Sequence, residues 1–200
     1  MLDQSFYARG AGIVARELLG KRLVRQQNGR LLSGIIVETE AYCDSVEPDL
    51  ACHAARANKG RPTKRTAVIF GPAGFAYVYF VYGMHWMFNV VTGQPEQANG
   101  VLVRALEPVD GLDLMRENRN GRSDLTNGPA KLAQALQIDK KFAGANLCDP
   151  DGVLWVEEAP LIPKNTIRTG PRIGLGKTPE PWYSVPWRYW IRDNKFVSVR

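Results

Sequence analysis

The sequence predicts one mixed α/β (α+β) domain spanning residues 1–200, built from antiparallel hairpins and helices. Strand-like runs occur in pairs around short turn sequences, and helix-like runs stand before and after them. The composition fits a chain with its own core, since 44% of the residues are hydrophobic and 23% are charged. A chain of this length buries roughly 70% of its unfolded surface, so the core needs no disulfide or metal to support it.

The N-terminal part predicts a helix followed by a hairpin. Apolar residues at helical spacing follow Ser5 and stop at Gly20, which is the pattern of an amphipathic helix. Two strand-like runs then flank Asn28 and Gly29, the dipeptide that best fits a type I′ turn. These runs cover residues 23–27 and 30–42.

A second hairpin is predicted after a basic loop. Residues 43–66 have loop composition, and from His53 onward they carry five basic side chains and no acidic one. This charge fits either a solvated loop or a contact with phosphate. Tyr82 stands beside the hairpin turn at Gly83 and Met84, where an exposed aromatic side chain could act as a wedge between bases. The strands of this hairpin are predicted over 75–82 and 85–91.

The second half of the chain predicts another strand, two helices and several short strands. Arg104 lies inside an otherwise apolar strand-like run. Pro108 suits the first turn of a helix that ends near Arg119, and Pro129 suits the start of a second helix. The predicted elements cover 100–106, 108–119, 129–137 and, near the C-terminus, 187–191.

Charge and cysteine content limit the class of protein. A net charge of +6 and a pI near 9.3 favour a polyanionic partner such as nucleic acid or an anionic membrane. The charge-free window over 66–95 is interrupted by glycines and a proline, so a membrane-spanning helix is not expected. The three cysteines form no CxxC pair, and two histidines are too few for a metal site, so we expect an intracellular protein without a metal. The cysteines are Cys43, Cys52 and Cys148.

Two charged side chains in apolar surroundings are candidate site residues. Glu40 follows the apolar run 35–37 and shares a strand face with Glu38 and Tyr42. A carboxylate in such a setting needs a partner or a task, and Arg104 poses the same question within its own strand. If the two strands are neighbours, a buried ion pair explains both residues structurally. The alternative is a general base that is held and oriented by a cation.

Several short motifs follow one another from the first helix to the C-terminus. They are Val-Glu-Thr-Glu-Ala-Tyr at 37–42, His53, Tyr-Val-Tyr at 77–79, Tyr-Gly-Met at 82–84, Asn89, Val-Arg-Ala-Leu-Glu-Pro at 103–108, Asn-Gly-Pro-Ala-Lys-Leu at 127–132 and Phe-Val-Ser-Val at 196–199. Together they strongly resemble the alkyladenine (3-methyladenine) DNA glycosylase family over nearly the whole chain. The resemblance implies a compact mixed α/β domain with a curved antiparallel sheet, a protruding hairpin and peripheral helices, with no metal and no organic cofactor.

The resemblance also implies an activity. The family consists of DNA repair enzymes that extrude alkylated or deaminated purines from double-stranded DNA and cleave the N-glycosidic bond, leaving an abasic site. Its substrates include 3-methyladenine, 7-methylguanine, hypoxanthine and ethenoadenine. No lysine stands at a position of an attacking amine, so we expect hydrolysis without strand cleavage. The protein is expected to act as a monomer in the bacterial cytoplasm or the eukaryotic nucleus, without contact to a membrane.

The roles of individual residues carry over at the matching positions. Glu40 would be the general base that activates a water for attack on C1′, with Arg104 beside it. Tyr82 would enter the minor groove and fill the gap left by the flipped nucleotide. The base pocket would consist of Tyr42, His53, Tyr79 and Asn89. The DNA backbone would be contacted by Met84, Lys131, Gly174 and Lys177.

Two departures from the family pattern and two rival functions remain to be tested. Two residues are inserted between Tyr42 and His53 relative to the expected spacing, and His85 and Trp86 follow the wedge turn in place of other aromatic or apolar residues. A non-catalytic DNA damage-binding protein would keep the wedge and the basic surface but release no base. A hydrolase of RNA or of free nucleosides would not depend on duplex DNA.

Overall fold

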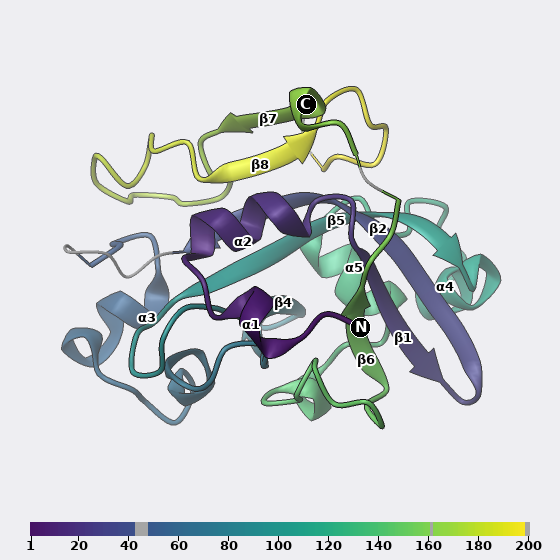
Figure 1. The fold of residues 1–200 in the computed structure, drawn as a ribbon, viewed down its shortest axis with the longest axis horizontal. Helices are drawn as coiled ribbons and strands as arrows, with labels where there is room; N and C mark the ends of the chain where they lie inside the picture. The colour runs from purple at the N-terminus through teal and green to yellow at the C-terminus, as the bar shows by residue number, and fades with distance from the viewer. Residues whose placement is uncertain (43–47, 161, 199–200) are drawn as a thin grey trace.

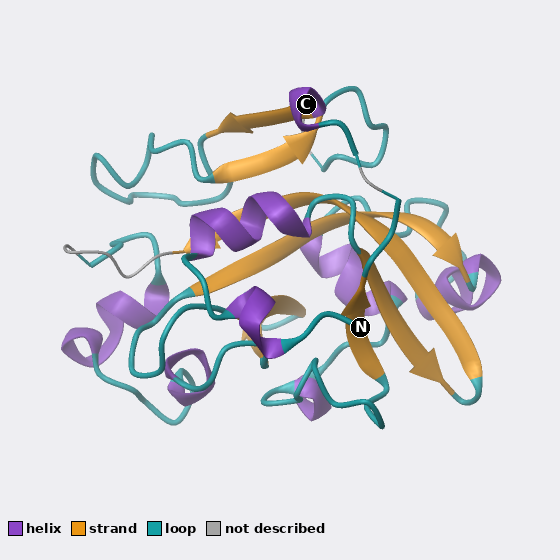
Figure 2. Ribbon diagram, in the orientation of Figure 1, coloured by secondary structure: helices purple, strands orange, loops and turns teal. Residues whose placement is uncertain are grey.

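One curved antiparallel sheet forms the framework of the protein, with short helices around it (Figure 1, Figure 2). The structure is a computed structural model that describes residues 1–42, 48–160 and 162–198, so Cys43 and Val199 lie outside the described residues. The strands are β1 (Arg22–Gln27), β2 (Arg30–Tyr42), β3 (Ala76–Val81), β4 (His85–Val91), β5 (Gly100–Asp110), β6 (Leu154–Glu157), β7 (Ile167–Gly170) and β8 (Arg188–Ile191). The helices are α1 (Gln4–Tyr7), α2 (Ala11–Leu18), α3 (His53–Arg56), α4 (Leu112–Asn118) and α5 (Pro129–Ala135). Single 3₁₀ turns cover Ala57–Gly60, Ala67–Phe70, Lys140–Phe142 and Lys164–Thr166.

Strand β2 organises the sheet because it is long enough to pair with three other strands. Along one edge it pairs with β5, and along the other edge it pairs first with β1 and then with β8. The strand order is therefore β3-β4-β5-β2-β1-β6, with the β7–β8 hairpin joined at the end of β2. The register between β2 and β5 shifts on both sides of Glu38. Such bulges bend a strand and redirect its side chains, so Glu38 and its neighbours lie where the sheet curves.

Both predicted hairpins are present, and the second turn differs from the prediction in one residue. Asn28 and Gly29 have φ values of 50° and 76°, the two positive values that a type I′ turn requires. In the second hairpin, Val81 pairs with His85, which leaves three residues in the turn. Tyr82 is therefore inside the turn, with a φ of 55°, and is not the last strand residue.

The helix predicted from Pro108 is wrong at its start. Strand β5 continues through Pro108 to Asp110, and α4 begins at Leu112. Pro108 is tolerated because it faces Gly34 at a register shift between β2 and β5, where the regular ladder is interrupted. The helix ends next to Arg119, as predicted.

The first helix is divided into two, and the predicted loop contains a helical turn. Residues 8–10 separate α1 from α2, and the carboxylate of Asp3, not Ser5, accepts the capping bond from the Phe6 amide at 3.0 Å. Helix α3 begins at His53 within the segment that was expected to be a loop. The other helix, α5, begins at Pro129 as predicted.

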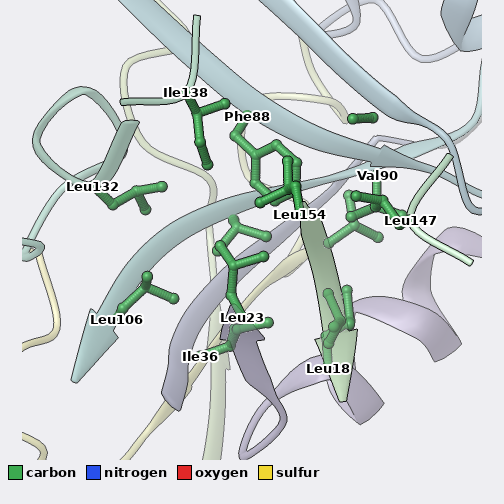
Figure 3. Packing of buried hydrophobic residues seen from close by; sticks show 14 of the residues in the cluster. Leu18, Leu23, Ile36, Phe88, Val90, Leu106, Leu132, Ile138, Leu147 and Leu154 are labelled. Atoms are coloured by element: carbon green, nitrogen blue, oxygen red, sulfur yellow. The ribbon is translucent and has the colours of Figure 1, made fainter. Parts of the chain in front are cut away.

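The main hydrophobic core joins both halves of the chain (Figure 3). It is filled by fully buried aliphatic and aromatic side chains from helices and from most of the strands. Those labelled in Figure 3 are Leu18, Leu23, Ile36, Phe88, Val90, Leu106, Leu132, Ile138, Leu147 and Leu154. Full burial of one such side chain contributes roughly 1.5–3 kcal/mol, so this core fixes the position of β2 and β5 beneath α2. Among the described residues, no helix combines the length and the apolar character needed to cross a membrane.

Gly34 tests the tight packing of β2 against β5. A Cβ atom at this position would lie 2.9 Å from both the Glu107 carbonyl oxygen and the Leu106 Cβ. Gly34→Ala should therefore lower the free energy of unfolding by about 1–3 kcal/mol through overpacking, as measured by urea unfolding. Gly12→Ala is the matched control, because a Cβ there meets only the Tyr189 hydroxyl at 3.4 Å and alanine favours the helix. Equal stability of the two variants would contradict this packing.

Candidate active site

A cavity of about 360 Å³ gathers most of the predicted site residues. It lies between the β3–β4 hairpin, the start of α3 and the loop that follows β7. The predicted residues that line it are Tyr42, His53, Tyr79, Tyr82, Asn89, Arg104 and Gly174. The predicted residues outside its lining are Glu40, Met84, Lys131 and Lys177.

Three aromatic rings form one wall of the cavity. Residues 77 and 79 alternate on β3, so both tyrosines face the same side of the strand. The centroid of the His53 ring lies 4.6 Å from that of Tyr79, and the two tyrosine centroids are 5.3 Å apart. His53 Nε2 and the Tyr77 hydroxyl lie 2.5 Å apart, within hydrogen-bond distance. The sequence alone does not tell whether Tyr77 belongs to the core or to the site, because aromatic residues at strand spacing occur in both.

Asn89 is oriented by the neighbouring strand. It pairs with Tyr77 across the β3–β4 hairpin, and its Nδ2 donates to the Tyr77 carbonyl oxygen at 3.1 Å. Because the side chain is almost completely buried, this bond fixes which part of the amide group faces the cavity.

Glu40 is fully buried, directly behind the cavity wall. Its Oε1 accepts from the Ile173 amide at 2.7 Å and lies 3.2 Å from Arg104 Nη1, and its Oε2 accepts from the Tyr42 hydroxyl at 2.9 Å. All three donor residues line the cavity. Burial and the Glu40 charge raise the pKa of the Tyr42 phenol well above its usual value, so the phenol keeps the proton that it donates.

Arg104 bridges two buried carboxylates. Its Nε lies 3.3 Å from Glu38 while Nη1 reaches Glu40, so β2 and β5 are joined by the ion pair that their neighbouring positions allow. Glu38 also accepts from Arg188 Nε and from the Ser198 amide, each at 2.7 Å. Burial opposes the charge on Arg104, but the two carboxylates outweigh burial and raise the pKa of the guanidinium. The buried ion pair between the two strands is therefore present, and the role of Glu40 as a general base stays a prediction.

A second buried ion pair lies beside the cavity, between Arg172 and Asp49. Their atoms Nη1 and Oδ2 are 2.5 Å apart, and Nη2 and Oδ1 are 2.9 Å apart. Sequence reasoning missed both residues, because they lie 123 positions apart in loop-like segments. The remaining signal was weak: Arg172 precedes the glycine-containing stretch that begins at Ile173.

The predicted DNA-facing residues lie around the mouth of the cavity and on the surface beyond it. Tyr82 and Met84 at the hairpin tip are 77% and 67% exposed. Gly174 has a φ of 77° and open space at its Cβ position, and Lys177 is exposed in the same loop. Lys131 Nζ, on α5, lies 2.9 Å from an Asp124 carboxylate oxygen.

Part of the basic loop reaches the cavity. Arg56 and Arg65 are among the lining residues, and Arg65 Nη2 donates to the Phe80 carbonyl oxygen at 2.6 Å. Burial, followed by the charges of Arg65 and Arg56, lowers the pKa of His53 to about 4. His53 is therefore neutral at pH 7 and contributes an aromatic face without a charge. Among the described residues, no group of three or more His, Cys, Asp or Glu side chains is arranged to hold a metal ion.

Comparisons with known proteins agree on one family. The family model described as methylpurine-DNA glycosylase matches residues 5–195. A Carboxydothermus hydrogenoformans protein named "Putative 3-methyladenine DNA glycosylase" is 46% identical over 202 residues, which cover 100% of both chains. A Myxococcus xanthus protein of the same name is 47% identical over 98% of this chain and 93% of its own length. A Clostridium botulinum protein of the same name is 42% identical over 100% of both chains.

The neutral state of His53 predicts a loss of stability in acid. Between pH 6.5 and about 4, the unfolded chain binds a proton at His53 that the folded protein does not bind. The free energy of unfolding should therefore fall as the pH drops through this window, with His53 contributing up to about 3 kcal/mol. His53→Gln should remove this contribution, so urea unfolding at pH 7 and pH 4.5 should show a smaller acid loss than in the wild type. His85→Gln, which removes an exposed imidazole, is the control, and an equal acid loss in wild type and His53→Gln would contradict the prediction.

Proposed function

Because the chain belongs to the methylpurine-DNA glycosylase family, we propose that it removes alkylated and deaminated purines from double-stranded DNA. Membership makes it a DNA glycosylase of DNA repair, a hydrolase that acts on N-glycosyl bonds. The proposed substrates are 3-methyladenine, 7-methylguanine, hypoxanthine and ethenoadenine. Residues 1–200 would act as one catalytic domain and as a monomer, without metal or organic cofactor, and the product would be an abasic site. The observation that carries the proposal is the buried Glu40 carboxylate behind an aromatic cavity.

The cavity would hold the purine after it leaves the base stack. A base cannot be excised within the duplex, and its extrusion costs a few kcal/mol, least for damaged or mispaired bases. The cavity volume lies at the lower end of the range for small-molecule sites, which suits a single base. The faces of Tyr42, His53 and Tyr79 would sandwich the purine. A cationic alkylpurine would gain about 0.5–2 kcal/mol from these electron-rich faces.

Glu40 would activate the attacking water. An ionised carboxylate has about four acceptor positions, and Arg104, Ile173 and Tyr42 together occupy three of them. With the described residues, the position that is left is on Oε2, beside the Tyr42 hydroxyl, and it would accept a hydrogen bond from the water. As the N-glycosidic bond breaks, its electron pair leaves with the purine and the sugar gains oxocarbenium character. The water oxygen then bonds to C1′ and its proton passes to Glu40.

Tyr82 would replace the flipped nucleotide in the duplex. It is the most exposed of the large hydrophobic side chains described, and it stands at the tip of a hairpin. Its left-handed backbone conformation is rarely favourable for a bulky residue, which is typical of a position held for a function. Inside the cavity, Asn89 would lie against the purine edge and disfavour the 2-amino group of normal guanine.

Contacts with the DNA backbone would hold the duplex across the cavity. Gly174 offers open space beside its backbone, which allows close approach of a phosphate. Further contacts with the backbone of either DNA strand would come from Lys177, Lys131 and the Met84 backbone. Because phosphate contacts release counterions, binding by several of them becomes weaker as the salt concentration rises.

Replacement of the proposed base tests the chemistry. Glu40→Gln should reduce single-turnover release of hypoxanthine and 3-methyladenine from duplex DNA by about 10²–10⁴-fold, because the amide cannot accept the proton from water. Binding to lesion-containing DNA should remain. Glu107→Gln is the matched control, because the Glu107 carboxylate accepts a hydrogen bond from Asn194 and does not line the cavity. Undiminished release by Glu40→Gln would remove Glu40 from its role, and absence of release by the wild type would favour the damage-binding protein.

Replacement of Tyr82 tests the wedge. Tyr82→Ser should weaken binding and base release for lesion-containing duplexes more than it weakens binding to undamaged duplex, because only the flipped state needs the aromatic side chain. The measurement compares the two dissociation constants and the single-turnover rate. Tyr183→Ser removes another exposed tyrosine, one that does not line the cavity, and is the matched control. Equal losses for both duplexes would reject the wedge role.

A further inference from the structure

The ion pair between Asp49 and Arg172 is fully buried beside the cavity but does not line it. Its two parallel hydrogen bonds use the planar fork of the guanidinium, a geometry that fixes direction as well as distance. A buried ion pair costs desolvation and is often no more stabilising than apolar side chains of the same size. Stability alone therefore gives no reason for this pair, whereas its hydrogen bonds can fix the positions of neighbouring residues.

Arg172 contacts the back of the Tyr42 ring. The guanidinium carbon lies 4.7 Å from the centroid of Tyr42 and 5.1 Å from that of Trp187. Its Nη1 also donates to the carbonyl oxygen of Ala41, the residue before Tyr42, at 3.0 Å. The ring that forms one face of the proposed base sandwich is thus supported from behind by a cation that is itself held in place.

The next residue in the chain carries the second consequence. Ile173 directly follows Arg172, and its backbone amide donates to Glu40 Oε1 at 2.7 Å. Tyr42 donates to the other oxygen of the same carboxylate. Of the three donors to Glu40 among the described residues, one is thus in contact with Arg172 and one directly follows it in the chain.

Asp49 connects the pair to the other wall of the cavity. Its carboxylate accepts from the Ala51 amide at 2.9 Å, and its carbonyl oxygen accepts from the Cys52 amide at 2.9 Å. Cys52 is the capping residue of α3, whose first residue is His53. A single ion pair thus links the segment that carries His53 to the loop that carries Ile173.

We propose that Asp49 and Arg172 are positioning residues for base excision. Their ion pair holds Tyr42 and the Ile173 amide against Glu40, and it thereby sets the free acceptor position on Oε2 and the separation of the two aromatic walls. This inference rests on the proposed function, because it assigns to the pair an effect on the water and base that the glycosylase reaction uses. A displacement of about 1 Å at such a position is expected to cost roughly 10²-fold in rate.

Conservative variants at the pair measure this effect. Arg172→Lys keeps the charge but loses the fork and the flat surface behind Tyr42, and Asp49→Asn keeps the shape but loses the negative charge. Each should lower the single-turnover rate of hypoxanthine release by roughly 10- to 100-fold while affinity for abasic-site duplex stays unchanged. Arg22→Lys, which alters an ion pair with Asp110 at the far end of the β2–β5 pairing, is the matched control and should leave the rate unchanged. A loss of affinity equal to the loss of rate would overturn the proposal.

A double variant separates positioning from general stability. If Arg172 acts through Glu40, then Arg172→Lys should cause little further loss of rate in a Glu40→Gln background. A full additional loss in that background would show an independent effect and would overturn the proposal. If Arg172→Lys does not fold, Asp49→Asn in the same background carries the same two outcomes.

Amide hydrogen exchange at Ile173 gives a readout that needs no substrate. In the wild type, the bond to Glu40 should protect this amide, and Arg172→Lys should accelerate its exchange while amides of the main core keep their rates. Unchanged exchange at Ile173 in an active enzyme would overturn the positioning role alone. Absence of base release by the wild type would instead overturn the proposed function, so the two failures are distinguishable.

Discussion

The burial of two carboxylates on one strand is the constraint on which the rest of this structure depends. Glu38 and Glu40 are both fully buried, and a charge in the interior is tolerated only when it is paired and hydrogen-bonded. Within β2, the Tyr42 hydroxyl donates to Glu40, whereas the cations that pair with the two carboxylates come from other strands. Arg104 arrives on β5 and Arg188 on β8, which are the strands that flank this part of β2. With the strand order β5-β2-β8, arginines on the flanking strands therefore both neutralise the two carboxylates and donate hydrogen bonds to them.

Glu38 and Glu40 share Arg104 but differ in their other partners. This difference suits Glu38 to a structural task and Glu40 to the proposed catalytic one. Glu38 is held by Arg104, Arg188 and the Ser198 amide, so it joins the sheet to the C-terminal segment. The donors of Glu40 among the residues that the structure describes, Arg104, Ile173 and Tyr42, line the cavity. Glu38 therefore joins parts of the fold, whereas Glu40 is separated from the cavity by its donor residues. The bulges beside Glu38 bend β2 and thereby help to point the two carboxylates toward different partners.

Sequence patterns predicted the features that depend on local chemistry. Asn28 and Gly29 specified their turn, and the charges of Glu40 and Arg104 in apolar runs indicated that each needs a partner or a task, which is an ion pair if their strands are neighbours. Pro108 led to a wrong helix start, because a register shift between strands distant in sequence decides whether proline fits a sheet. Asp49 and Arg172 could not be found, since their pairing exists only after the fold brings two loop segments together.

Positive charge lines the cavity at Arg56 and Arg65, and negative charge lies behind the lining at Glu40. Arg56 and Arg65 line the cavity near its aromatic wall, where they would attract phosphate and where they also help to lower the pKa of His53. The same cations repel a positively charged purine, so attraction for such a base must come from the neutral aromatic faces. No acidic side chain is among the described lining residues, and the Glu40 carboxylate lies behind that lining, in contact with Tyr42, Arg104 and Ile173. Under the proposed mechanism, a flipped nucleotide would meet negative charge where the sugar becomes positive during bond cleavage, so the carboxylate would favour the transition state over the bound base.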